Sequence, residues 1–100
     1  MPAATEPGSG DSPPLRIAEH SPPPEYPASA LRKGERGVVM LSVAVDAQGR
    51  PTRVRVVQRS GSRALDRAAV EAVQRWRFQP ALSAGQAVAG EVEIPIEFSP

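Results

Sequence analysis

Apolar and polar residues recur with two different periods along this chain, and the periods predict its elements. Between Ser62 and Trp76 the spacing is helical, and one apolar stripe contains Leu65, Ala68, Ala69, Ala72, Val73 and Trp76. Arginines and Glu71 occupy the other side. Pro80 prevents continuation, because it lacks an N–H and disfavours helical geometry in Gln79. The stripe predicts an amphipathic helix that covers a small sheet, with Trp76 at its wide end.

Period-two alternation predicts three strands around this helix. In the first, from about 36 to 46, the aliphatic face is Val39, Leu41, Val43 and Val45. In the second, from about 52 to 59, one face carries Val54 and Val56 and the other Arg53, Arg55, Val57 and Arg59. The last, from about 87 to 98, sends inward Val88, Val92, Ile94, Ile96 and Phe98, and outward Glu91, Glu93 and Glu97.

Turn residues connect these elements into an α+β fold of the order α-β-β-α-β. Pro27 suits the first turn of a short helix over 28–33, which Gly34 ends. In the turn over 46–51, Gly49 is the expected left-handed residue. We predict a three-stranded antiparallel sheet of order 2-1-3, both helices on one face. The alternative is order 1-2-3, with the third strand parallel to the second. The expected core is Val39, Leu41, Val43, Val45, Leu65, Ala69, Val73, Trp76, Phe78 and Phe98.

Proline dominates the beginning of the chain, since eight of the twelve prolines lie in residues 1–27. We expect residues 1–24 to be the end of a proline-rich linker, disordered over 1–14, and residues 25–100 to form the domain. Pro22, Pro23 and Pro24 predict local polyproline II. The run over 15–18 alternates like a strand, and whether it pairs with the sheet stays open. His20 is expected to be solvated.

Composition removes several classes of function. The net charge of +1 gives no bulk argument for binding nucleic acid or an anionic membrane, and the arginines of the second strand lack interleaved aromatic residues. With no cysteine and one histidine, the sequence offers no metal site. It shows neither a nucleophile with a base nor a phosphate-binding glycine loop, so we expect no enzyme and no cofactor. A peptide-binding module is the better hypothesis.

Pro95 indicates where a peptide would bind. Proline cannot donate to a ladder, so the last strand should be an edge strand. If the nitrogen of Pro95 points away from the sheet, the peptide groups of Glu91, Glu93 and Glu97 also point outward and are unpaired. Such an edge accepts an extended peptide as an added strand.

Several segments, in order, resemble the C-terminal domain of the TonB family. They are Glu25-Tyr26-Pro27, Gly37-Val38-Val39, Asp46-Ala47-Gln48-Gly49, Ser60-Gly61, Leu65-Asp66-x-Ala68-Ala69, Trp76-Arg77-Phe78-x-Pro80 and Ile94-Pro95-Ile96-x-Phe98. The resemblance covers roughly residues 24–98. Family members carry energy from the inner-membrane ExbB–ExbD motor to outer-membrane transporters for iron-siderophore, haem or cobalamin, by gripping a peptide called the TonB box.

The resemblance implies a periplasmic domain that an N-terminal helix, absent from this sequence, anchors to the inner membrane. It also implies two contact regions for the partner. The residues expected to bind are Pro24, Glu25, Tyr26, Pro27, Glu91, Val92, Glu93, Ile94, Pro95, Ile96 and Glu97. Ser29 departs from the family, whose members carry a basic residue there, so a charge pair with the transporter is absent or shifted to Arg32 or Lys33.

The open edge could also exchange strands in a homodimer. The rival hypothesis is a TolA-like or TonB-paralogue domain that ties envelope components together without serving a nutrient transporter.

Overall fold

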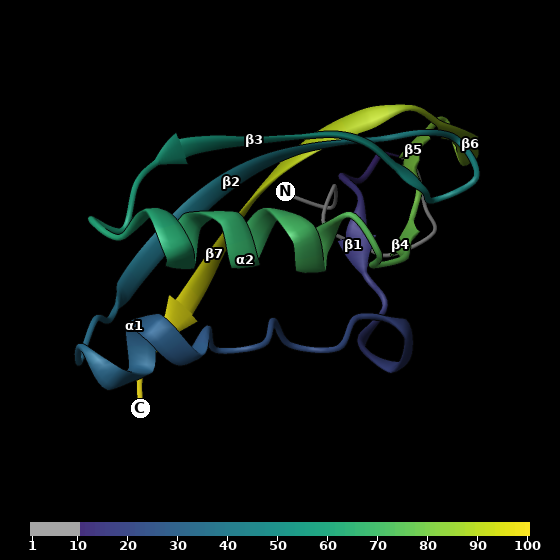
Figure 1. Ribbon diagram of the computed structural model, residues 1–100. Helices are drawn as coiled ribbons and strands as arrows, with labels where there is room; N and C mark the ends of the chain where they lie inside the picture. Colours follow the sequence, from purple (N-terminus) through teal and green to yellow (C-terminus); the bar gives the residue numbers. More distant parts are fainter. Residues whose placement is uncertain (1–10) are drawn as a thin grey trace, which may run out of the picture.

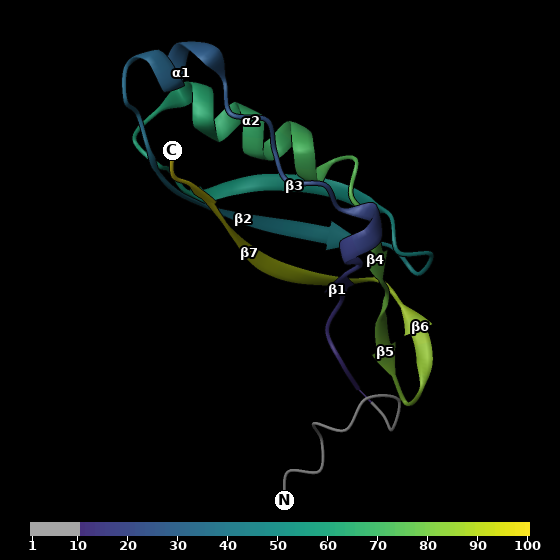
Figure 2. The same cartoon turned by 90° about the horizontal axis from the view of Figure 1, so that it is seen from below.

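The computed structural model describes residues 11–100, which form one antiparallel sheet covered by helices on one face, with two small strand pairs at one end (Figures 1 and 2). The elements are β1 (Leu15–Arg16), the 3-10 helix η2 (Ala18–His20), α1 (Ala28–Arg32), β2 (Gly37–Val45), β3 (Pro51–Gln58), α2 (Arg63–Val73), β4 (Phe78–Gln79), β5 (Ala81–Ser83), β6 (Gln86–Val88) and β7 (Gly90–Phe98).

The main sheet has the order β3-β2-β7, which confirms the predicted order 2-1-3 and excludes the alternative with a parallel third strand. β2 pairs with β7 without interruption, from Gly37 opposite Phe98 to Val45 opposite Gly90. The β2–β3 pair contains two register shifts, near Met40 and near Ala44. Because the extra residues lie in β3, the pairing of β2 with β7 remains regular along the whole of β7.

The core lies between the sheet and α2. Every residue of the expected core is at most 4% exposed, and Ala30 of α1 and Ile96 of β7 join the same cluster. Ser62 caps α2, since its hydroxyl accepts from the Leu65 N–H at 3.3 Å. The helix ends at Val73, so Trp76 lies beyond its last turn, where the indole is fully buried. Trp76 therefore closes the core at the end next to β4, where it packs beside Phe78.

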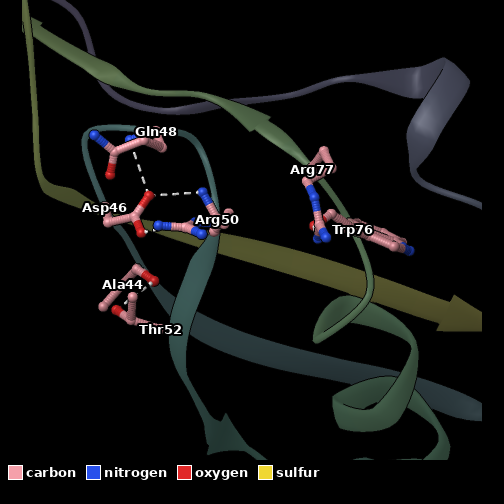
Figure 3. Close-up of polar contacts among 7 residues, drawn as sticks. All are labelled: Ala44, Asp46, Gln48, Arg50, Thr52, Trp76 and Arg77. Carbon is pink, nitrogen blue, oxygen red and sulfur yellow. Dashed lines mark hydrogen bonds and ion pairs between the residues drawn. The ribbon is translucent and has the colours of Figure 1, made fainter.

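The β2–β3 turn is held by Asp46, whose carboxylate accepts from the backbone N–H groups of Gln48 and Arg50, each at 2.9 Å (Figure 3). The backbone N–H of Arg50 is the main reason that the pKa of Asp46 lies below its ordinary value. Gly49 has φ +84°, the predicted left-handed conformation, and its carbonyl accepts from the Phe78 N–H at 2.9 Å. The turn thus packs on β4, with no room for a side chain at Gly49.

The structure departs from the expected linker between Asp11 and Pro22, a segment that we call the strap. Ser12 pairs with Leu82 of β5, and β1 pairs antiparallel with β4. Pro14 and Ser21 are buried, and the Ser21 hydroxyl donates to the Arg77 carbonyl at 3.3 Å. The strap has little apolar surface of its own, but it finds backbone partners in β4 and β5. The predicted disorder of residues 1–14 falls outside the described residues for 1–10 and is wrong for 11–14.

Two further differences concern strands. The run over 15–18 does pair, although with β4 rather than with the main sheet. The last strand begins at Gly90 and not near residue 87, because Gln86–Val88 folds back on Ala81–Ser83 as a hairpin that projects from the body (Figure 2). Val88, which we expected to face inward, is 36% exposed as a result. Ala84 and Gly85 form the hairpin turn with φ of +52° and +80°.

Candidate functional site

The outer edge of β7 is the feature of this fold best suited to binding. Within residues 11–100, β7 pairs with β2 alone, so its other side has no neighbouring strand. Pro95 lies near the end of this edge and is exposed. The structure therefore confirms that the last strand is an edge strand, as Pro95 predicts.

Two hydrogen bonds in β2 establish which backbone groups of β7 face outward. The Ala44 carbonyl accepts from the Thr52 hydroxyl at 3.2 Å, and the Asp46 N–H donates to the Arg50 carbonyl at 2.9 Å (Figure 3 shows the first). Both groups point toward β3. Since backbone direction alternates along a strand, the odd-numbered residues of β2 point toward β7. The residues opposite them bond inward, and these are Gly90, Val92, Ile94, Ile96 and Phe98.

The remaining positions of β7 turn their backbone groups away from the sheet. They are Glu91, Glu93, Pro95 and Glu97, so the proline nitrogen occupies a place where no ladder bond is lost. The three glutamate side chains are exposed, whereas Val92 and Ile94 are half-buried. A strand added here would thus meet free N–H and C=O groups of β7. Its side chains would lie beside Val92 and Ile94 on the helix face of the sheet, and beside the glutamates on the opposite face.

The Tyr26 region adjoins one end of this edge. The rings of Tyr26 and Phe98 meet edge to face, with centroids 5.5 Å apart. The Tyr26 hydroxyl donates to the Glu35 carbonyl, and the Glu35 carboxylate accepts from the Ser62 hydroxyl at 2.7 Å. Pro27 precedes the first turn of α1. The structure therefore brings the two predicted contact regions together, because Tyr26 packs on the last residue of β7.

The strap bounds the other end of the edge. A Cβ placed at Gly90 would lie 2.8 Å from the Ala81 Cβ and 3.4 Å from the Pro14 Cδ, so both residues crowd the start of β7. The outward-facing positions of the edge lie within residues 91–97. Pro14 and Ala81 pack against the start of this strand, and Tyr26 packs against its end. Sequence reasoning missed the strap, and the alternating run over 15–18 was the one pattern that could have indicated it.

The chemistry of the site is that of backbone recognition. Among residues 11–100, no three His, Cys, Asp or Glu side chains come close enough to hold a metal ion. None of the helices described has the length and apolar character needed to span a membrane. The unpaired peptide groups of β7 are what this surface offers to a ligand.

Comparison with known proteins gives consistent matches. A family model described as the Gram-negative bacterial TonB protein C-terminal matches residues 22–100. The tonB2 protein of Pseudomonas aeruginosa is 51% identical over 79 residues, which is 79% of this chain and 29% of that protein. A TonB protein of Xanthomonas campestris is 46% identical over 77 residues, which is 77% of this chain and 34% of that protein. The chain thus spans about a third of the length of these relatives.

Solved structures agree with the sequence matches. The solution structure of the Pseudomonas aeruginosa TonB CTD superposes with a TM-score of 0.71 at 30% identity, covering 90% of this chain and 89% of that one. A Helicobacter pylori TonB-CTD gives a TM-score of 0.57 at 28% identity, covering 76% of this chain and 79% of that one.

Proposed function

Because this chain belongs to the family of Gram-negative TonB C-terminal domains, we propose that it binds the TonB box of an outer-membrane transporter as a strand added to β7. The observation that carries the proposal is the run of outward backbone groups over residues 91–97, next to Tyr26. The domain acts by binding and not as an enzyme. It works in the periplasm, where the chain preceding it leads to an inner-membrane anchor and the ExbB–ExbD motor.

The expected affinity is moderate. Each backbone hydrogen bond contributes a net ~0.5–1.5 kcal/mol, so four or five bonds give ~2–7.5 kcal/mol before ordering costs. Backbone bonds alone therefore correspond to millimolar binding, and contacts of the peptide side chains are needed to reach the micromolar range. Weak capture lets the domain release its transporter after each uptake event. The same edge could accept a strand from a second copy of this chain, which would compete with the peptide.

Proline substitutions at neighbouring positions test the site. Glu93→Pro removes an outward N–H and spares the inner ladder, so we expect about 2- to 13-fold weaker binding of a TonB-box peptide at nearly unchanged melting temperature. Val92→Pro removes an inward N–H, so it should destabilise the domain itself by more than ~1 kcal/mol. Glu93→Ser is the control, and it should bind almost as tightly as the parent because exposed charges contribute little.

Affinity is measured by titrating the ¹⁵N-labelled domain with the peptide, at several protein concentrations to reveal any homodimer. If Glu93→Pro binds the box peptide as tightly as the parent does, strand addition at β7 is wrong. If no box peptide binds at all, the rival hypothesis of an envelope-tethering domain takes precedence.

A further inference from the structure

A hollow lies between α2 and the extended segment 22–27. This segment runs beside the helix, on the side away from the sheet (Figure 1). Its volume is about 720 Å³, within the usual range of ligand sites. Ala64, Ala68 and Ala72 line it at one residue per turn of α2, facing Pro22–Pro24. Ala68, which we expected on the sheet side of the helix, is half-exposed here. We call this hollow the α2 groove.

Arginine side chains border the α2 groove without carboxylate partners. Arg63, Arg67 and Arg75 line it, and in the part of the chain that the structure describes no carboxylate lies within ion-pair distance of these three residues. Asp66 of the same helix is engaged elsewhere, since it accepts from the N–H and the hydroxyl of Ser60 at 2.9 and 2.8 Å. Three cationic side chains thus stand against two carboxylates of the lining, Glu25 and Glu71.

The proline side of the groove supplies hydrogen-bond acceptors. The Pro22 carbonyl accepts from the Trp76 indole N–H at 2.7 Å, which fixes this segment beside the helix. Within residues 11–100, no hydrogen bond engages the carbonyls of Pro23 and Pro24. An extended chain lying in the groove could therefore donate its backbone N–H groups to carbonyls of one wall, while its carboxylates accept from the arginines of the other wall.

We propose that the α2 groove docks an acidic extended peptide segment of a partner protein, whose carboxylates pair with Arg63 and Arg67. Four residues of helix advance ~6 Å, and two residues of extended chain advance ~6.6 Å, so acidic residues at alternate positions match this arginine pair. From Arg63 to Arg75 the helix advances ~18 Å, which accommodates about five extended residues. This length favours a peptide over a small anion.

The test is a titration of the ¹⁵N-labelled domain with a five-residue-core peptide containing Glu-x-Glu, compared with the same peptide containing Gln-x-Gln. We expect the acidic peptide to shift the amide signals of Ala64, Ala68 and Ala72. The double variant Arg63→Gln and Arg67→Gln should bind it roughly 2- to 30-fold more weakly. Glu25→Gln should have the opposite effect and strengthen binding, because it removes a carboxylate from the lining.

The matched control removes two positive charges from the exposed face of β3, by Arg53→Gln and Arg55→Gln, and should change the affinity much less. Equal binding by the parent and by the Arg63/Arg67 double variant would overturn the proposal, as would equal binding of the Gln-x-Gln peptide. Signal shifts confined to β7 would also overturn it. The groove does not depend on strand addition, so a box peptide that fails to bind leaves this test unaffected.

Discussion

Trp76 connects the core of this domain to the strap, and replacing it tests both roles. Its side chain is fully buried beside Phe78, with ring centroids 6.5 Å apart, and the Arg16 guanidinium lies 4.6 Å from the ring centroid. Removing so large a buried ring costs ~3–5 kcal/mol of unfolding free energy. We therefore expect Trp76→Ala to lose a large part of the stability of a domain this small.

Trp76→Phe separates the polar contact from the packing. It keeps an aromatic ring but removes the hydrogen bond to the Pro22 carbonyl, worth ~0.5–1.5 kcal/mol, and weakens a cation–π contact worth ~0.5–1 kcal/mol. We expect a loss of ~1–2 kcal/mol. The strap should loosen first, so the amide hydrogen of Ile17, which bonds to the Arg77 carbonyl, should exchange faster.

Urea unfolding and amide hydrogen exchange measure these effects. Val57→Ala serves as a control, because Val57 is 45% exposed and its truncation should change stability by less than ~0.5 kcal/mol. A loss below ~1 kcal/mol for Trp76→Ala would refute the assignment of Trp76 to the core. Unchanged exchange of Ile17 in Trp76→Phe would show that the indole does not hold the strap.

Three further substitutions or deletions have defined outcomes. Gly49→Ala should cost more than ~2 kcal/mol in thermal melting, since its Cβ would lie 2.0 Å from a carbonyl of β4, whereas Gly61→Ala, at φ +101° in open space, should cost only ~1 kcal/mol. Asp46→Asn should lower the melting temperature only at pH values well above the pKa of Asp46 in the folded protein. The backbone N–H of Arg50 lowers that pKa from 3.8, so the stabilisation is present above pH 3.8 and disappears as pH falls, and melting curves of both proteins should converge in acid. Deleting residues 1–14 removes two backbone hydrogen bonds to β5 and should cost ~1–3 kcal/mol in urea unfolding.

The main sheet and α2 were predictable because their patterns are local and mutually consistent. Alternation in β2 and β3 identified the hairpin, and the helical stripe ending at Trp76 identified α2. Gly49 was recognised as left-handed from turn chemistry alone. Pro95 carried long-range information, because the missing N–H of a proline is tolerated only where no strand lies alongside.

The strap and the β5–β6 hairpin depend on partners that local pattern does not identify. β1 is two residues long, and its partner β4 directly follows the Trp76-Arg77 stop of the helix, which we interpreted only as a termination. Val88 fits the alternation of β7 in sequence but belongs to the hairpin, because Ala84 and Gly85 reverse the chain just before it. The adjacency of Tyr26 and Phe98 was likewise a matter of tertiary packing.

The antiparallel pairing of the strap has a mechanical consequence. The chain enters at Asp11, whose carboxylate accepts from the Ala84 N–H at the hairpin tip, and then meets β5, β4 and finally Trp76 in turn. Tension applied upstream of Asp11 would therefore break these contacts in sequence, beginning with the one at Asp11, and not all at once. Once released, residues 11–22 can extend to at most about 40 Å at ~3.3–3.6 Å per residue, more than they span when paired, while β7 and any peptide bound to it stay folded.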